Sequence, residues 1–339
     1  MTAKLKLTRE QILAFRRHVS ALDARLPMSP DSLRQAAWAG LQDSMPRAAL
    51  LSIHARVRDT QADTIYDDSL LQIWGPRYSA YVVPAVDRAV FTLSRMPDDE
   101  RGRKRAEAAA ERLRAMIGHS RVGHHDVGEQ MGINPNSLRY GTVTGEIAIR
   151  WEGARQPTIW MLPRPETTRE EARAELARRY LHVFGPTTAT RFAEWAGISE
   201  RAGGAAFDEL ALETSAVHTS AGDAQILTAD ESTLRVTADE PAPARLLPSG
   251  DTYFLLWGTD RELLVPDARR REQLWTSRVW PGAVLVRTEI VGVWRRANEK
   301  VTVEAWRQLA PAERAAVEEE ASAMPLPGLT RDITVSWVG

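Results

Sequence analysis

Three consecutive polar residues, Gln42, Asp43 and Ser44, lie between two apolar runs of the sequence. Side chains two residues apart share one side of the backbone only where the chain is extended, and Pro46 favours extended geometry at Met45. We therefore expect Gln42 and Ser44 to point the same way. A glutamine can orient a water molecule but cannot take its proton, and Asp43 is the one carboxylate of the triplet. If Asp43 faces the other way, the pair has no general base.

The same triplet also has a purely structural interpretation. Ser44 could cap a helix that opens at Pro46, and Gln42 could bond to the backbone of the turn. From the residues alone, both interpretations stay open.

Other residues that could bind metals or act as nucleophiles give weaker signals. His124 and His125 are adjacent, whereas two zinc ligands on one helix face are four residues apart, so we expect no metal site. His54 follows Pro46 on an apolar helix and is expected in the core or at an interface. The chain has no cysteine, which excludes disulfides, iron–sulfur clusters and a cysteine nucleophile. We expect no cofactor.

Local signals mark the helices that must position these residues. Thr8–Gln11 and Thr168–Glu171 have the pattern of capping boxes, and Ser29 before Pro30 is a typical helix start. Two later segments, 125–140 and 187–212, each predict a helix, a glycine turn and a second helix, and each follows a longer helix, at 103–117 and 168–183. The turns fall at Gly132 and Gly197, and the second helices begin after Asn134 and Ser199. This order is typical of helix-turn-helix units, which also occur in protein-interaction modules.

Strand patterns follow both units. Residues 146–151 and 157–162 alternate around a glycine turn at 152–156, which predicts a hairpin and hence a winged helix. After the second unit, 225–228 and 233–237 resemble strands. Prolines in 238–248 suggest a linker, and apolar runs at 253–257, 283–294 and 300–304 before a closing helix at 311–324 predict a small, mostly β domain.

Charge is unevenly distributed although the net charge is only −1. Residues 101–155 carry ten Arg or Lys against six acids, 261–300 carry nine against five, and 206–243 carry one against eight. One basic face could bind a polyanion, although ordinary solvated helix surface explains such counts equally well. We find no apolar run of the roughly 18 residues that would span a membrane and no secretory signal, so we expect a cytoplasmic protein.

Several ordered motifs resemble the bacterial winged-helix DNA glycosylases of the AlkZ/YcaQ type, which excise alkylated bases and unhook interstrand crosslinks. The motifs are Gly40–Gln42 with 46–49, Trp74–Arg77, Arg139–Gly145, Glu171–Tyr180, and Trp280–Ala283 with Gly292–Arg296. The resemblance implies an α+β fold, in which tandem winged helix-turn-helix units form a concave body beside a small β-rich, barrel-like C-terminal domain. The implied domains are a degenerate first unit at 1–100, winged helices at 101–165 and 166–240, and the β-rich domain at 241–339.

The family places Gln-x-Gln or Gln-x-Asp after Gly-Leu or Gly-Val; here Gln42 matches and Ser44 replaces the second residue. Tyr81 stands where the family tends to have histidine. The resemblance implies that Gln42 and Ser44, with Asp43 as the neighbouring carboxylate, position water. The other residues it suggests contact the lesion or DNA: Arg47, Trp74, Arg77, Tyr81, Arg139, Arg150 and Arg155.

The implied activity is monofunctional, metal-free hydrolysis of the N-glycosidic bond of alkylated purines or crosslinks, by analogy with glycoside hydrolysis. The implied partner is damaged double-stranded DNA, with no membrane, and the implied state is a monomer at the nucleoid. Two alternatives are a catalytically inactive winged-helix DNA-binding protein, such as a regulator or damage sensor, and a protein-interaction scaffold, which the near-zero net charge favours.

Overall fold

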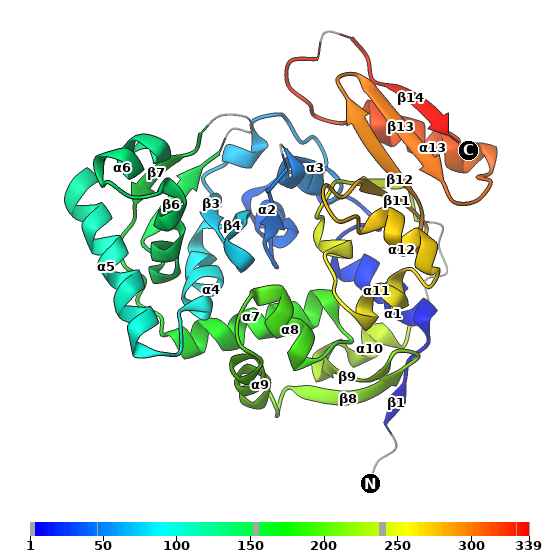
Figure 1. Ribbon diagram of the computed structural model, residues 1–339. Helices are drawn as coiled ribbons and strands as arrows, with labels where there is room; N and C mark the ends of the chain where they lie inside the picture. Colours follow the sequence, from blue (N-terminus) through cyan, green and yellow to red (C-terminus); the bar gives the residue numbers. More distant parts are fainter. Residues whose placement is uncertain (1–3, 46, 152–155, 237–241, 330, 339) are drawn as a thin grey trace.

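The computed structural model describes residues 4–45, 47–151, 156–236, 242–329 and 331–338 (Figure 1). Of the segments named above, Arg155, Pro46, most of the 152–156 turn and part of the 238–248 linker lie outside these residues. The fold mixes helices with three sheets.

A six-stranded antiparallel sheet carries the Gln42 segment. Its order is β2 (Leu41–Gln42), β4 (Ala80–Pro84), β3 (Leu70–Trp74), β6 (Ile147–Arg150), β7 (Thr158–Met161) and β5 (Val122–Gly123). The predicted hairpin is present as β6 and β7. The pair Gln72–Ile149 joins β3 to β6, so the sheet continues across the expected boundary at residue 100. The first two expected units therefore share one sheet.

Helices begin where the capping signals predict them. Thr8 forms its capping box at α1 (Arg9–Val19), and Ser29 caps α2 (Pro30–Ala36). Two short helices follow, α3 (Ala48–His54) and α4 (Arg88–Thr92). The first helix–turn–helix segment comprises α5 (Glu100–Ile117), α6 (His124–Gln130), a left-handed turn at Gly132 and η5 (Pro135–Thr144). The element after Asn134 is a 3₁₀ helix rather than an α-helix.

The second helix–turn–helix segment has the predicted helices but a different strand partner. Thr168 forms the capping box of α7 (Arg169–Phe184), and the glycine turn joins α8 (Ala189–Ala196) to α9 (Glu200–Glu209). Strand β9 (Gly222–Leu227) pairs with β8 (Thr214–Thr219), which in turn pairs with β1 (Leu5–Lys6). The strand expected at 233–237 is wrong, because Glu231–Leu234 forms helix α10. Strand β8 has one fully buried apolar residue, Val217, so its sequence gives little strand signal.

The C-terminal region is built on an open sheet of β10 (Arg245–Leu247), β11 (Gly282–Val286), β12 (Glu289–Ala297), β13 (Lys300–Ala305) and β14 (Thr334–Val338), in that order. Among the described residues β10 and β14 are its edges, so no closed barrel is present. Strand β10 lies within the stretch expected as a linker. The strand expected at 253–257 is wrong: Asp251 caps a 3₁₀ turn at Thr252–Phe254. Helices α11 (Thr259–Leu264) and α12 (Ala268–Leu274) precede β11, and α13 (Pro311–Ser322) is the expected closing helix.

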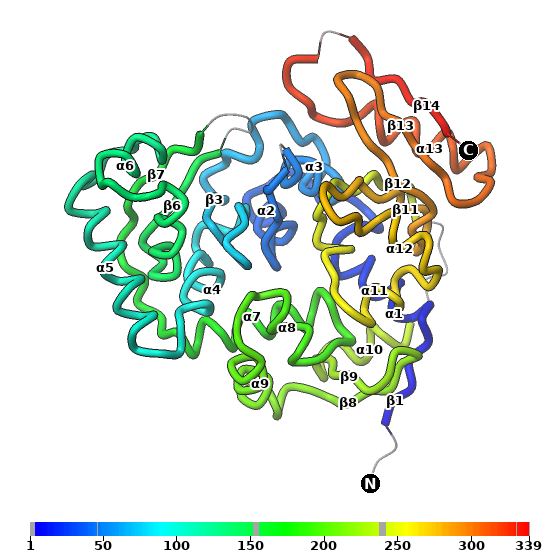
Figure 2. Tube along the Cα trace, in the orientation of Figure 1, coloured from blue at the N-terminus to red at the C-terminus, as the bar shows by residue number. Residues whose placement is uncertain are grey.

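Figures 1 and 2 show these elements arranged around a centre, with α5 and α6 on one side, α7 and α8 below, and α11 and α12 on the other side. Helices α2 and α3 lie between the two sides. The C-terminal sheet lies above α12, far from the N-terminus. No helix in the described residues is both long and apolar enough to cross a membrane.

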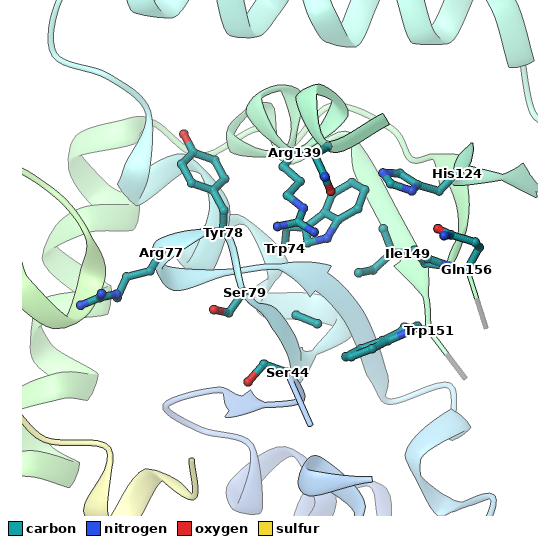
Figure 3. A pocket seen from close by; sticks show the side chains of 13 residues that line it. Ser44, Trp74, Arg77, Tyr78, Ser79, His124, Arg139, Ile149, Trp151 and Gln156 are labelled. Atoms are coloured by element: carbon teal, nitrogen blue, oxygen red, sulfur yellow. The ribbon is translucent and has the colours of Figure 1, made fainter. Parts of the chain in front are cut away.

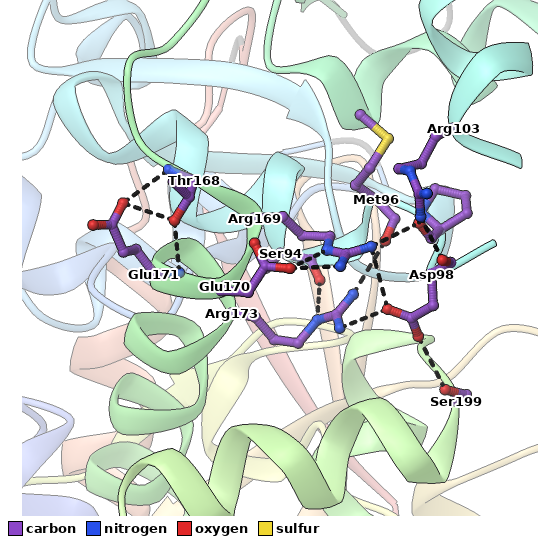
Figure 4. A network of polar contacts seen from close by, with 11 residues as sticks. Ser94, Met96, Asp98, Arg103, Thr168, Arg169, Glu170, Glu171, Arg173 and Ser199 are labelled. Atoms are coloured by element: carbon purple, nitrogen blue, oxygen red, sulfur yellow. Dashed lines mark hydrogen bonds and ion pairs between the residues drawn. The ribbon is translucent and has the colours of Figure 1, made fainter. Parts of the chain in front are cut away.

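A polar network fixes α7 to the chain that leads into α5 (Figure 4). Arg173 donates to the carbonyl oxygens of Ser94 and Met96 at 2.8 and 3.1 Å and to Asp98 Oδ1 at 2.9 Å. Ser199, which caps α9, donates to Asp98 Oδ2 at 3.4 Å. Burial alone would raise the pKa of Asp98, but the Arg173 guanidinium outweighs it and the pKa falls below its usual value. The charged carboxylate thus ties α7 and α9 to the 94–98 segment.

Candidate active site

Gln42 and Ser44 lie together at the edge of the six-stranded sheet. Gln42 ends strand β2, opposite Tyr81 of β4, and its Nε2 donates to Ser44 Oγ at 2.7 Å. The next residue keeps the extended path, since the Asp43 N–H donates to the Ala80 carbonyl at 2.8 Å. The expected same-side arrangement of the pair is therefore present. Ser44 is exposed and Gln42 is half-buried, so a ligand can reach both.

Asp43 points into the protein. Its side chain is 3% exposed; Oδ1 accepts the Ala49 N–H at 3.1 Å and Oδ2 accepts Gln72 Nε2 at 2.8 Å. Burial raises the pKa of Asp43 to about 7, although both hydrogen bonds act to lower it. Asp43, rather than Ser44, satisfies a free N–H in the first turn of α3. Ser44 is therefore left with Gln42 as its partner.

Gln72 connects this segment to the first helix–turn–helix region. Its Oε1 accepts the Trp151 N–H at 2.7 Å, while its Nε2 donates to Asp43. Gln72 is 5% exposed, and both polar atoms of its amide are hydrogen-bonded. Sequence reasoning missed Gln72; the available signal was one polar residue inside the otherwise apolar strand Leu70–Trp74.

A distant loop supports the other side of Gln42. A Cβ placed on Gly250, which has φ +74°, would lie 3.1 Å from Gln42 Oε1. The next residue, Asp251, forms a fully buried bidentate ion pair with Arg56, 2.8 Å for each bond, and accepts the Ser52 hydroxyl at 2.6 Å. This pair anchors the loop to α3 and so fixes the wall against which Gln42 rests. No sequence signal links these residues, because they are almost 200 positions apart.

A pocket of about 590 Å³ opens beside Ser44 (Figure 3). Its described lining consists of Ser44, Trp74, Arg77, Tyr78, Ser79, Ala80, His124, Asn136, Arg139, Ile149, Trp151, Gln156 and Pro157. Three residues expected at the site, Trp74, Arg77 and Arg139, are thus brought together with Ser44. Sequence reasoning left Tyr78, Ser79, Asn136 and Gln156 out.

Trp74 forms a buried wall of this pocket and is 3% exposed. The Arg139 guanidinium lies 5.9 Å from the centre of the Trp74 ring, and the His124 ring lies 5.3 Å from it. His124 Nε2 is 2.8 Å from the Pro135 carbonyl, which requires the proton on Nε2, and burial lowers the pKa of His124. A neutral His124 therefore holds Trp74 and the start of η5 in place.

Arg77 and Tyr78 both have left-handed backbone geometry, with φ of 56° and 58°. Non-glycine residues adopt it at an energetic cost, and such strain concentrates at functional sites. Arg77 packs against Gly197 of the second glycine turn and stacks on Trp257, 5.3 Å from the ring centre. It lies where three parts of the chain meet.

The other expected residues that the structure describes do not line the pocket. Tyr81 is 2% exposed, its ring close to Gly40 and Gly75, and burial raises the pKa of its hydroxyl. Arg47, at φ 66°, donates to the Pro327 carbonyl at 3.5 Å. Arg150 stacks on Tyr66, 4.0 Å from the ring centre. Within the described residues no group of three or more His, Asp or Glu could hold a metal ion.

The polar pair and the pocket residues fall within residues 36–325, which match the model of a family described as DNA glycosylase AlkZ-like. The chain therefore belongs to the AlkZ-like DNA glycosylase family. Among solved structures, the Streptomyces sahachiroi DNA glycosylase AlkZ is similar, with a TM-score of 0.80, 18% identity, and coverage of 98% of this chain and 100% of that one. At that identity the likeness shows a shared fold. No curated protein sequence matches the chain.

Proposed function

We propose that this protein is a monofunctional DNA glycosylase that hydrolyses the N-glycosidic bond of alkylated purines or crosslinks in double-stranded DNA. The observation that carries the proposal is the Gln42–Ser44 hydrogen bond beside the pocket, in a member of a DNA glycosylase family. We further propose a monomer that works at the nucleoid in the cytoplasm, with two or more winged-helix units as its DNA-binding body.

The two side chains can orient one attacking water. Ser44 Oγ already accepts a hydrogen bond from Gln42 Nε2 and retains a second lone pair, and Gln42 Oε1 is also an acceptor. A water that donates both protons to these oxygens turns its own lone pair toward C1′ of the damaged nucleotide. As the C–O bond forms, the C1′–N bond breaks, the base leaves with that electron pair, and the water's proton passes to solvent.

The orientation of Asp43 restricts the substrate. Its carboxylate is bonded to Ala49 and Gln72, so it positions α3 and the Gln42 segment rather than deprotonating water. Without a general base, the reaction depends on a good leaving group. A purine alkylated at N7 or N3 carries a positive charge and leaves as a neutral base, so it meets this requirement.

Several arginines and Tyr81 supply the DNA contacts in this proposal. We assign Arg77 and Tyr81 to the side of the lesion, where Tyr81 acts by supporting strand β4. The DNA backbone is assigned to Arg47, Arg139, Arg150 and Arg155. Contacts of this kind give affinity without sequence preference and weaken as salt rises.

Two measurements on the full chain test the proposal. The first is binding to a duplex with a single N7-methylguanine at low and high salt, which we expect to be tight and strongly salt-dependent. The second is alkali cleavage after incubation, which we expect to reveal abasic sites at the lesion. Binding without release from methylated or crosslinked DNA would instead identify a catalytically inactive DNA-binding protein. Absence of binding at low salt would favour a scaffold.

A further inference from the structure

Arg77 lines the pocket but has no polar partner in the described part of the chain. Its side chain is exposed and, in Figure 3, extends away from Trp74 and Trp151. It stacks on Trp257 and lies close to Gly197, where a Cβ would be 3.1 Å from Arg77 Cγ. Stacking uses the face of a guanidinium and leaves the N–H groups at its edge free for an acceptor.

A second arginine shares the same tryptophan. The Arg261 guanidinium, on α11, lies 6.0 Å from the centre of the Trp257 ring. It also lies 5.0 and 5.3 Å from the ring centres of Trp275 and Trp280. Its Nε donates to the Leu256 carbonyl at 2.6 Å, whereas its two Nη atoms have no hydrogen-bond partner among the described residues. Both Arg261 and Trp257 are half-buried, so a ligand can reach the two side chains.

Neither arginine has a carboxylate of its own in the part of the chain that the structure describes. Burial lowers the pKa of Arg261 below its usual value, and the positive charge of Arg77 lowers it further. The carboxylate that opposes these effects, Glu194, is ion-paired with Arg191 at 2.7 Å. Since Arg77 and Arg261 repel one another, an anion that contacts them gains affinity. DNA presents such an anion at every phosphodiester, and guanidinium groups bind it through paired N–H groups.

We propose that Arg77 and Arg261 bind the phosphate backbone beside the lesion, and that Trp257 is the positioning residue that holds the two guanidinium groups for this contact. Because Arg77 also lines the pocket beside Ser44, these phosphates lie next to the damaged nucleotide. Helix α11 belongs to the C-terminal region, so that region takes part in DNA binding. The inference rests on the proposed function and assigns the lesion-side contact of Arg77 to a phosphate.

Removal of single phosphate charges tests this contact. The probes are duplexes that carry a tetrahydrofuran abasic-site analogue, which the protein cannot hydrolyse, and a neutral methylphosphonate at each neighbouring phosphate in turn. For the wild type, we expect the methylphosphonate at one or two positions to weaken binding by about tenfold, the effect of losing one charge-assisted hydrogen bond. In Arg261→Met, at least one of these positions should no longer matter. The slope of log K against log salt should become shallower by about 0.9, which corresponds to one phosphate contact.

Arg77→Met provides a second test of the same contact. Because the Arg77 guanidinium has no polar partner among the described residues, its removal should leave the fold intact. We expect this variant to lose the effect of the methylphosphonate at the same position or the next one. The matched control is Arg314→Met: Arg314 lies 4.4 Å from the ring centre of Trp337 in the C-terminal sheet, and its removal should leave the salt slope unchanged.

Substitutions of Trp257 test its positioning role, because they keep both charges. In Trp257→Leu we expect the shallower salt slope of the arginine variants, since the guanidinium groups lose the ring that orients them. In Trp257→Tyr, which retains an aromatic face, the wild-type slope should return. A wild-type slope in Trp257→Leu would contradict this role.

The duplex experiments separate the inference from the proposed function. If no single methylphosphonate weakens wild-type binding, or if Arg261→Met and Arg77→Met keep the wild-type slope and the wild-type methylphosphonate pattern, the inference is wrong even where base release is seen. If the phosphate effects and their loss are seen but methylated duplexes release no base, the phosphate contact stands and the proposed glycosylase activity fails. Absence of duplex binding at low salt would overturn both.

Discussion

The carboxylate of Asp43 lies between Gln42 and Ser44 in sequence but faces the opposite direction, where Ala49 and Gln72 bond to it. The spacing of the triplet indicated that Gln42 and Ser44 would share a side, because this follows from an extended backbone. It could not identify the partners of Asp43, since Gln72 lies 29 residues away. The orientation of Gln42 and Ser44 could thus be derived from local geometry, whereas the residues that hold Asp43 beneath them could not.

Two buried residues, His54 and Asp43, should change stability with pH in opposite directions. Burial lowers the pKa of His54 to about 3, with Arg25 and Arg245 adding to the effect, and burial raises the pKa of Asp43 to about 7. Between pH 3 and 6.5 the unfolded chain binds the His54 proton more strongly than the folded one, so stability falls with falling pH. Between pH 4 and 7 the folded chain retains the Asp43 proton, so stability falls with rising pH.

Replacing His54 should expose the contribution of Asp43. In His54→Leu, Arg25 keeps its ion pair with Glu320 at 2.7 Å, and the acid-sensitive contribution is removed. The measured quantity is the free energy of unfolding of the variant minus that of the wild type. We expect this difference to be larger at pH 5 than at pH 7 by on the order of 2 kcal/mol. Urea unfolding of both proteins at the two pH values measures this difference. If the stability of the wild type and of the variant changed equally with pH, His54 would not be held neutral in the folded protein.

At the level of elements, local signals predicted helix starts well, because a capping side chain bonds to backbone within the same turn. Thr8, Ser29, Thr168 and Ser199 all cap helices as expected. The strand predictions that failed depended on distant contacts. Residues 253–256 are apolar because they are buried in the main core, and Trp257 packs against it, whatever the backbone geometry of this stretch.

The loop before the 3₁₀ turn at Thr252 should control activity through Gln42. In Gly250→Ala, the new methyl group would lie 3.1 Å from Gln42 Oε1 and displace it from the water site. We expect single-turnover base release to fall about tenfold, since small displacements at a reacting centre are costly. Gly328→Ala is the control, because Gly328 has the same φ of +74° with open space around it. Equal rates in the two variants would show that only backbone strain matters.

At the scale of the whole molecule, the site depends on segments that are distant in sequence. Strands from the first 100 residues and from 147–161 share one sheet, Gln72 bridges Asp43 to Trp151, and the Arg56–Asp251 pair brings the C-terminal region against α3. The sequence indicated an α+β chain, which the structure bears out; α-helices lie on both sides of the Gly197 turn, whereas a 3₁₀ helix follows the Gly132 turn. The shared sheet and the open C-terminal sheet could not be predicted, because strand pairing depends on partners that no local pattern names.

The most direct test of the account is the single-turnover release of 7-methylguanine from a duplex by excess wild type and Gln42→Ala. Asp43 and the sheet hold the segment in place without the Gln42 side chain, so we expect the affinity for the duplex to be unchanged. We expect the rate of release to fall by about a hundredfold or more. Release at the wild-type rate by Gln42→Ala would contradict the claim that Gln42 and Ser44 place the attacking water.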